Sequence, residues 1–553
     1  MSRAKVPMST PNTVGDAIVE TLIQQGVSAV YGVISIHNLP IADAIGRHET
    51  LRFVPARGEA GAVTMADAHG RQRGLGVALT STGAGAGNAV GALLEALNAG
   101  APLLHITGQV ERDYLGRESG FIHETQDQIG FLRACSKRAY SAHTAEQVVP
   151  VLRRAMRDAM TPPMGPVSVE IPIDLQGATI ESQTLGYAVA RAAAPTFDEG
   201  GFASLVERLQ QARRPMLWVG GGALQAGDAV RRLADAGLPV ISSTHGRGIL
   251  ADSHPRSLRA FHNAAAVEEL LAQSDLLIVA GSKLRSNETK TFTLPLPRPL
   301  VQVDIDPAAC HRTYLVDDFL EGDCTEVLEA LAERFEATRL GDDDYDTEVV
   351  RAVAEAERAL RQQMGPYAEL CDALRRALPD DGILVRDITM SGSTWGSRLF
   401  PIETPNTNVH SLAGAIGMGL SMAIGSAVAK PTCKVVGLVG DGGLMLGVGE
   451  LATMVQENLD MTLIVMNDGG YGVMRGIQRN YFSDRQYYNE LLTPSFTRLA
   501  DAMGLPHWHL SSADEAARVL QDAVAHAGPA LVEVDMASFG ELVFAGPPQK
   551  KLY

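Results

Sequence analysis

Two oxygen-bearing side chains, Asp441 and Asn467, each follow a short run of apolar residues that is typical of a buried strand. Glycines surround both: the chain reads GDGG over 440–443 and NDGG over 467–470. A helical pattern over 445–456 joins the two runs, so the stretch predicts a βαβ unit that brings the carboxyl ends of its strands together. Carboxylate and carboxamide oxygens, with backbone carbonyls freed by glycine, suit a hard cation such as Mg²⁺, which completes its shell with phosphate oxygens. Each half alone is equally compatible with a simple turn or loop.

A carboxylate far upstream, Glu59, is a second candidate for chemistry. It follows a predicted strand directly and opens an Ala- and Gly-rich helical pattern. A glutamate in the first turn of a helix most often only stabilises the helix dipole. The Gly-rich stretch STGAGAGN over 81–88 also follows a strand, but Asn88 stands where a dinucleotide-binding fingerprint needs its last glycine.

These motifs together resemble the thiamine diphosphate-dependent enzymes of the acetolactate synthase, benzoylformate decarboxylase and pyruvate decarboxylase type. GDGG followed by Asn467 resembles the GDG…N diphosphate-binding motif of that family, and VPARGEAGAVTMADAHGR resembles HEQGAAFAADGYAR. STGAGAGN is similar to TSGPGATN. The resemblance implies thiamine diphosphate and Mg²⁺ as cofactors. It implies Asp441, Asn467 and the Gly469 carbonyl as metal ligands, and Glu59 as the catalytic partner of the aminopyrimidine N1′.

The segment 410–427, HSLAGAIGMGLSMAIGSA, is rich in small residues, which alone is typical of a closely packed core helix. It is similar to the GTMGFGLPAAIGA of the family. The resemblance places Ile416 beneath the cofactor as an apolar wedge, and a β-branched wedge is stiff at χ1. It places the Gly414 carbonyl where it accepts a hydrogen bond from the 4′-amino group. The cofactor contacts implied in this way are Gly83, Gly85, Asn88, Gly414, Ile416, Gly440, Gly442, Gly443 and Tyr471.

Residues on the substrate side are less distinctive. His37 aligns with an active-site histidine of benzaldehyde lyase and is a candidate acid/base group, while a surface or capping histidine is an equal alternative. His123 replaces the Gln of the FQE segment of the family and is a second catalytic candidate. Val473, Met474 and Ile477 follow the metal loop on a predicted helix and suggest a pocket for a nonpolar substituent.

Three successive patterns of short strands and helices must position these residues. They predict an α/β fold with three consecutive doubly wound parallel-sheet domains. The expected domains span 12–180, 195–340 and 360–545, and the resemblance implies pyrimidine-binding, middle and diphosphate-binding roles for them. The stretches 186–199 and 341–348 are interpreted as linkers, although the acidic second one is also compatible with the solvated start of a helix.

The middle domain holds Gly220, Gly221 and Gly222 directly after a strand. A nucleotide cradle is one interpretation, since acetolactate synthases bind FAD in this domain. However, GSKLRSNET over 281–289 replaces the GARFDDR of the family, so a structural turn is favoured and FAD is not expected.

Composition excludes other classes of function. The chain has 553 residues, 46% of them hydrophobic, and a net charge of −17, which argues against nucleic acid or an anionic membrane as a partner. The five cysteines show no CxxC pattern and are expected to be buried or free thiols. The N-terminus lacks a signal-peptide core, and no run of ~18 apolar residues predicts a membrane span, so a cytoplasmic protein is expected. GxSxG, Walker and HExxH motifs are absent.

The expected function is therefore that of a thiamine diphosphate- and Mg²⁺-dependent enzyme, which acts on 2-oxo acids by decarboxylation, carboligation or both. The alternatives are C–C cleavage in 2-hydroxy ketones or diketones, and a nucleotide-binding relative without catalysis. The substrate is expected to be a small molecule. The resemblance implies a homo-oligomer, at least a dimer and expected as a tetramer, with active sites at the dimer interface.

Overall fold

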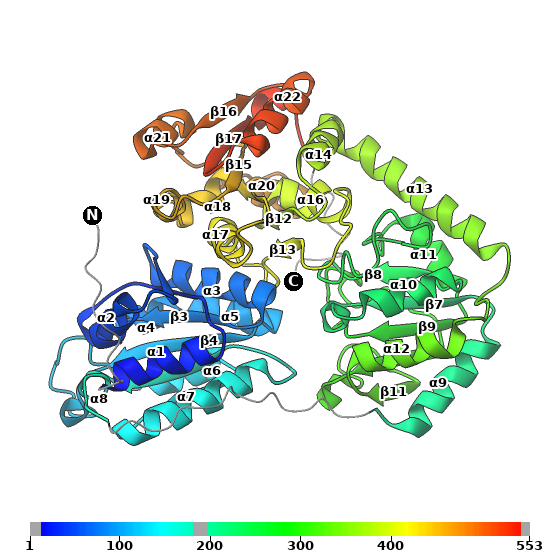
Figure 1. Ribbon diagram of the computed structural model, residues 1–553. Coiled ribbons are helices and arrows are strands. Elements are labelled where there is room, and N and C mark those ends of the chain that lie inside the picture. Colours follow the sequence, from blue (N-terminus) through cyan, green and yellow to red (C-terminus); the bar gives the residue numbers. More distant parts are fainter. Residues whose placement is uncertain (1–12, 181–196, 544–553) are drawn as a thin grey trace. The chain divides into compact units, whose positions relative to one another are not determined.

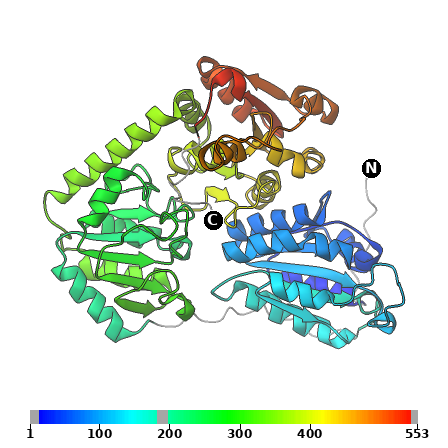
Figure 2. The same ribbon diagram turned by 180° about the vertical axis from the view of Figure 1, so that it is seen from behind.

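The computed structural model describes residues 13–180 and 197–543 and contains three parallel sheets in chain order (Figure 1 and Figure 2). This confirms the predicted fold class. The described residues fall into two compact units. Of the described residues, unit 1 takes 13–180 together with Ser411–Thr432 and Leu446–Met461, and unit 2 takes the rest.

The sheet of unit 1 has six strands in the order β2-β1-β3-β4-β6-β5. Helices α3 (Glu59–Arg73) and α5 (Val90–Ala99) cover one face, and α1 (Val14–Gln24) and α7 (Ala145–Met160) cover the other (Figure 1). The strand bounds are β1 (Ala29–Gly32), β2 (Arg52–Pro55), β3 (Gly76–Thr80), β4 (Leu103–Gln109), β5 (Arg138–Ser141) and β6 (Val167–Pro172). The central strands β3, β4 and β6 are buried along their whole length, as parallel strands covered on both faces must be.

Two helices from the C-terminal part of the chain also belong to unit 1. Helix α17 (Gly419–Ala429) packs against α3 so closely that a Cβ added to Gly425 would lie 2.1 Å from the Met65 carbonyl oxygen. Close packing therefore explains the small residues of this segment, although the helix begins only at Gly419. The single helix predicted over 445–456 is wrong. Two helices, α18 (Asp441–Leu446) and α19 (Glu450–Gln456), are separated where Gly-Val-Gly lowers helix propensity.

The middle sheet, in unit 2, has five strands in the order β11-β10-β9-β7-β8. The bounds are β7 (Pro215–Val219), β8 (Val240–Ser242), β9 (Leu276–Ala280), β10 (Leu300–Asp304) and β11 (Asp318–Glu321). The glycines after β7 pack against the turn after β9. A Cβ on Gly220 would lie 2.4 Å from the Gly281 oxygen, and one on Gly221 would lie 2.4 Å from the His245 ring. Close packing within the protein accounts for these glycines.

The acidic run over 341–348 is not a linker throughout. Helix α13 (Tyr345–Met364) begins inside it, as the alternative interpretation had it. Asp346 in its first turn forms ion pairs with Arg256, at 2.7 Å, and with Arg339, at 2.8 Å. The stretch predicted as the first linker lies, through residue 196, outside the described residues. Asp198 then caps the N-terminus of α9 (Glu199–Gln211).

The third sheet, also centred in unit 2, has six strands in the order β13-β12-β14-β15-β17-β16. Helix α14 (Pro366–Ala377) packs against α22 (Ala513–Ala525) beside it. The bounds are β12 (Ile383–Arg386), β13 (Asn408–His410), β14 (Val435–Gly440), β15 (Met461–Asn467), β16 (His507–Leu510) and β17 (Ala530–Asp535). The three sheets lie within the three expected domain ranges, whose precise bounds stay a prediction.

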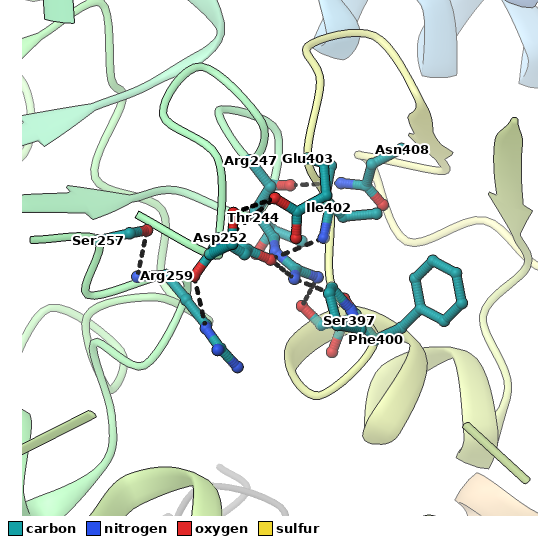
Figure 3. A network of polar contacts seen from close by, with 12 residues as sticks. Thr244, Arg247, Asp252, Ser257, Arg259, Ser397, Phe400, Ile402, Glu403 and Asn408 are labelled. Carbon is teal, nitrogen blue, oxygen red and sulfur yellow. Dashed lines mark hydrogen bonds and ion pairs between the residues drawn. The ribbon is translucent and has the colours of Figure 1, made fainter. Parts of the chain in front are cut away.

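A buried polar network joins the middle domain to the segment that precedes β13, within unit 2 (Figure 3). Arg247 and Asp252 form an ion pair with no exposed side-chain surface. The Arg247 guanidinium also donates to the Phe400 carbonyl at 2.6 Å and the Ser397 carbonyl at 3.0 Å. Asp252 accepts from the Ile402 backbone N–H at 2.9 Å. Each charge is therefore neutralised and hydrogen-bonded, as burial requires.

Two further expectations from composition can be compared with the structure. The five cysteines form no disulfide, and Cys135, Cys324 and Cys371 are buried, which confirms the expectation of buried or free thiols. Within the described parts of the chain, no helix combines the length and apolar character that crossing a membrane needs.

Candidate functional site

The predicted metal loop lies at the carboxyl ends of two neighbouring strands. Asp441 follows β14 and opens α18, while Asn467 is the last residue of the adjacent strand β15. The strand–helix–strand pattern therefore places the two side chains at the same edge of the sheet, where ligands of open α/β sheets bind.

The Asp441 carboxylate is completely buried, and within the described residues neither of its oxygens has a hydrogen-bond partner. Burial raises the pKa of Asp441 to about 6, and the neighbouring Asp468 carboxylate contributes to the rise. A buried carboxylate without partners is unfavourable unless a cation accompanies it. The donor set therefore fits a bound metal ion.

Asn467 and Gly469 present further oxygens. The Asn467 amide nitrogen donates to Glu533 at 2.8 Å. The amide oxygen accepts one hydrogen bond, from the Gly469 N–H at 3.3 Å, and keeps a lone pair for a metal ion. Gly469 has φ +75°, and its carbonyl accepts from the Leu491 N–H at 3.1 Å, which leaves one lone pair. Within the described chain, no cluster of three or more His, Cys, Asp or Glu side chains could hold a metal.

The remaining residues of the loop pack against one another. A Cβ added to Gly442 would lie 2.9 Å from the Tyr471 ring, so the two residues predicted to contact the cofactor are adjacent. Gly443 is buried, and a Cβ on Gly440 would lie 3.1 Å from Thr389. Small residues are therefore required here by packing, and they leave the backbone able to approach a ligand.

Helix α20 (Gly472–Tyr481) follows the loop and carries the three predicted pocket residues, with none of its residues fully buried. Val473 packs against the core of the domain, whereas Met474 is 44% exposed and Ile477 is partly exposed. A cavity of about 190 Å³ opens beside this helix, but none of the three lines it. Its lining includes Met390, Asp468, Arg475, Arg479, Met536 and Glu541.

Glu59 lies in unit 1 as the first residue of α3 and is half-buried. Its carboxylate accepts a hydrogen bond from the Asn88 amide at 3.2 Å. A Cβ added to Gly85 would lie 2.9 Å from the other carboxylate oxygen. The structure thus brings Glu59 together with the Gly-rich turn, a contact that no sequence pattern specified.

The two candidate histidines also lie together. The His37 and His123 rings are 5.1 Å apart between centroids. His37 is 4% exposed, which argues against the surface alternative, and its Nδ1 has no hydrogen-bond partner in the described part of the chain. Burial, and then His123, lower the pKa of His37, so its imidazole is neutral at neutral pH. His123 is exposed and has φ +65°.

Gly83 connects the histidines to the Gly-rich turn. It has φ +60°, and a Cβ there would lie 2.4 Å from the His123 carbonyl oxygen. Its N–H donates to the Gln128 side chain at 2.8 Å, and Gln128 in turn donates to Glu170 at 3.0 Å. Only glycine fits both the left-handed backbone and this contact.

Gly414 and Ile416 lie in the segment between β13 and α17, which belongs to unit 1 from Ser411 onward. Gly414 has φ +88°, and Ile416 is 39% exposed. An exposed isoleucine next to a left-handed glycine is compatible with the predicted wedge, which needs an apolar side chain free to meet a ligand.

Two buried carboxylates that the sequence analysis gave no role support the group of site residues in unit 1. Glu450, on α19, accepts from the backbone N–H groups of Arg57 at 2.9 Å and Gly58 at 3.2 Å. Its carboxylate thereby caps the N-terminus of α3, directly before Glu59. Glu95, on α5, binds the start of the segment that carries Gly414. A charged residue inside an otherwise apolar helix, as in VGALLEALNA, was the signal that could have found Glu95.

The predicted site residues thus form two groups, one in each unit. Unit 1 holds Glu59, Gly83, Gly85, Asn88, His37, His123, Gly414 and Ile416. Unit 2 holds Asp441, Gly440, Gly442, Gly443, Asn467, Gly469, Tyr471, Val473, Met474 and Ile477. The first group offers acid/base side chains after β1, β2 and β4, with the Gly-rich turn after β3. The second offers oxygen ligands at the carboxyl ends of β14 and β15.

Comparison with protein-family models gives three matches in chain order. The N-terminal TPP (thiamine pyrophosphate, that is, thiamine diphosphate) binding domain of thiamine pyrophosphate enzymes matches residues 12–131. The central domain matches 202–331, and the C-terminal TPP binding domain matches 387–534.

Relatives extend along nearly the whole chain. "Acetolactate synthase isozyme 1 large subunit" of Escherichia coli K12 is 30% identical over 540 residues, which cover 94% of this chain and 93% of that protein. "Probable 2-ketoarginine decarboxylase AruI" of Pseudomonas aeruginosa is 30% identical over 528 residues, with 94% of each chain covered. "Acetolactate synthase catalytic subunit, mitochondrial" of Saccharomyces cerevisiae is 25% identical over 559 residues, which cover 95% of this chain and 80% of that protein. These matches support thiamine diphosphate as the cofactor, and the chain belongs to the family of thiamine diphosphate-dependent enzymes.

Proposed function

We propose that this protein is a thiamine diphosphate- and Mg²⁺-dependent enzyme that acts on 2-oxo acids by decarboxylation, carboligation or both. The observation that carries the proposal is the buried, unpartnered Asp441 carboxylate beside Asn467, because such a group needs a cation. The family supports it, as do relatives whose names describe acetolactate synthases and a 2-ketoarginine decarboxylase.

Mg²⁺ would be held by Asp441, Asn467 and the remaining lone pair of the Gly469 carbonyl, with the diphosphate completing the shell. Glu59 would form a hydrogen bond with N1′ of the cofactor's aminopyrimidine, beside Gly83, Gly85 and Asn88. Gly414 and Ile416 would contact the same cofactor, as would Gly440, Gly442, Gly443 and Tyr471.

Bound thiamine diphosphate supplies a carbon nucleophile for a substrate carbonyl and accepts the electrons that remain when CO₂ leaves. Glu59 then holds or releases a proton at its carboxylate, assisted by the hydrogen bond from Asn88. His37, neutral and with Nδ1 unpartnered, can accept a proton from a substrate hydroxyl at that atom. His123 is close enough to share this task. Val473, Met474 and Ile477 are proposed to contact an apolar substituent of the substrate.

The assembly and location follow from the same proposal. Because the resemblance to the family implies it, we propose a homodimer, or a tetramer of two such dimers, with the Glu59 of one chain facing the metal loop of the other. The domains are proposed to span 12–180, 195–340 and 360–545. Cysteines without disulfides favour the cytoplasm.

The test combines binding with product analysis. Isothermal titration calorimetry should detect thiamine diphosphate binding that requires Mg²⁺ and disappears with EDTA. A panel of 2-oxo acids should then release CO₂, and Glu59→Gln should lose most turnover while still binding the cofactor.

The same panel includes 2-hydroxy ketones, which separate the alternative. Aldehyde formed from a 2-hydroxy ketone, without CO₂ from any 2-oxo acid, would favour C–C cleavage instead. Absence of Mg²⁺-dependent binding would refute the proposed cofactor site.

A further inference from the structure

Glu95 is a buried carboxylate that faces only hydrogen-bond donors. It lies on α5 and is 1% exposed. One of its oxygens accepts from the Ser411 hydroxyl at 2.7 Å and from the Ala413 N–H at 2.9 Å. The other accepts from the Leu412 N–H and lies 3.7 Å from the Arg71 guanidinium. Three successive residues of one segment are therefore bound by a single side chain.

Glu95 shares the Arg71 guanidinium with a second carboxylate, Asp67, within the same unit. Arg71, on α3, forms a two-pronged ion pair with Asp67, with contacts of 2.7 and 2.6 Å. All three side chains are buried or nearly so. Because a buried charge is stable only when it is paired and hydrogen-bonded, Glu95 is fixed in position by α3 as well as by its own helix.

The segment bound by Glu95 contains two glycines in left-handed backbone conformations. It runs from Ser411 to Met418, and Gly414 and Gly417 within it both have positive φ, at +88° and +82°. A Cβ added to Gly414 would have no atom within 4 Å, so the space on that side of the residue is open. The far end is held where the Thr64 hydroxyl contacts the Met418 sulfur at 3.2 Å.

We infer that Glu95 is a positioning residue, which sets the location of the Gly414 carbonyl and the Ile416 side chain by holding residues 411–413. The inference rests on the proposed function, since those two groups are the proposed cofactor contacts. A carboxylate is needed because all four partners donate. A glutamine would turn its NH₂ group toward at least one donor and would leave that contact unmade.

The test uses the full-length protein with Glu95→Gln, and Asp67→Asn as the matched control. Asp67 belongs to the same buried network, but it acts through Arg71 and is one step removed from the segment. Hydrogen–deuterium exchange of the 411–418 peptide reports the anchoring without any cofactor. Calorimetry with Mg²⁺ measures the Kd for thiamine diphosphate, and separately for inorganic diphosphate.

In Glu95→Gln, the Leu412 and Ala413 amide hydrogens should exchange with solvent faster than in the wild type. The Kd for thiamine diphosphate should rise about tenfold, which corresponds to the loss of one hydrogen bond to a charged group. The Kd for inorganic diphosphate should stay within about twofold, because the metal loop is untouched. Asp67→Asn should lower the melting temperature but leave both Kd values and the exchange of 411–418 near those of the wild type.

Equal binding of thiamine diphosphate by the wild type and Glu95→Gln would refute the inference, and so would equal weakening by Asp67→Asn. A wild type that binds no thiamine diphosphate would instead refute the proposed function. If Glu95→Gln fails to fold, Ser411→Ala removes one donor from the other side. It should raise the Kd about threefold, and an unchanged Kd together with unchanged exchange would overturn the inference.

Discussion

Replacing Asp441 with asparagine should stabilise the protein without its cofactor while weakening the cofactor complex. The wild-type carboxylate is fully buried, has no hydrogen-bond partner in the described chain and faces a second carboxylate, that of Asp468. Asparagine keeps the shape and removes the charge. Burying a polar group without a partner costs about 1–3 kcal/mol, and more for a charged group, so the substitution should add about 1–2 kcal/mol to the free energy of unfolding.

The effect on metal binding has the opposite sign. Losing the charge of a buried partner costs about 2–4 kcal/mol, which is roughly a 30- to 1000-fold rise in the Kd for Mg²⁺ with thiamine diphosphate. Stabilisation of the empty protein and loss of affinity would together show that Asp441 is placed for a cation rather than for the fold.

Thermal unfolding in EDTA measures the first effect, and about 1 kcal/mol corresponds to a rise of roughly 2–4 °C in Tm for a domain of about 150–250 residues. Calorimetry measures the second. Asp468→Asn is the control. It removes the charge of a neighbouring carboxylate that has a partner, so it breaks the 2.9 Å ion pair with Arg475 and should lower the Tm. A lower Tm for Asp441→Asn in EDTA, with unchanged Mg²⁺ affinity, would refute the reasoning.

Three further outcomes are expected. Mixing inactive Glu59→Gln and Asp441→Asn proteins should restore about a quarter of wild-type activity after subunit exchange, since half the dimers would hold one intact site of two; no recovery would place each site within one chain. Asp252→Asn leaves the charge of Arg247 buried and unpaired, so denaturant unfolding should show a loss of about 3–5 kcal/mol, and a loss below about 1 kcal/mol would contradict the role of the ion pair. Burial lowers the pKa of His262 from the ordinary 6.5 to about 3. As the pH is lowered below about 6.5, the unfolded chain therefore binds a proton at His262 before the folded protein does, and the free energy of unfolding decreases. Between pH 7 and pH 5 the loss is about 2 kcal/mol, and His262→Phe should remove it; an unchanged pH dependence would mean that His262 is protonated in the folded protein.

Interior strands were predictable from sequence, and strands at sheet edges largely were not. β3, β4, β14 and β15 are continuous apolar runs because helices cover both faces of a parallel sheet. Four strands that lie at a sheet edge, β5, β11, β13 and β16, carry no such apolar run, because one side of each is unpaired and apolar continuity is not needed there.

The site shows the same division between local and distant order. The position of Asp441 beside Asn467 follows from the chirality of a single βαβ unit, so local pattern sufficed. Glu450 binds Arg57, which lies 393 positions away in the sequence, and Glu95 binds Ser411, which lies 316 positions away. No periodicity encodes such contacts, because they arise only when helices from two domains pack together.

Helices α17 and α19 limit how modular this protein is. The strands before and after them, β13, β14 and β15, are centred in unit 2, yet both helices cluster with the first domain. Ten of the 11 residues of α17 are buried, so a fragment with the C-terminal domain alone would expose an apolar helix and tend to aggregate. Domain exchange between relatives should therefore succeed only when the first and third domains are exchanged together. Replacing the middle domain would require preserving its polar contacts with residues 397–408, which are made by Thr244, Arg247, Asp252 and Ser253.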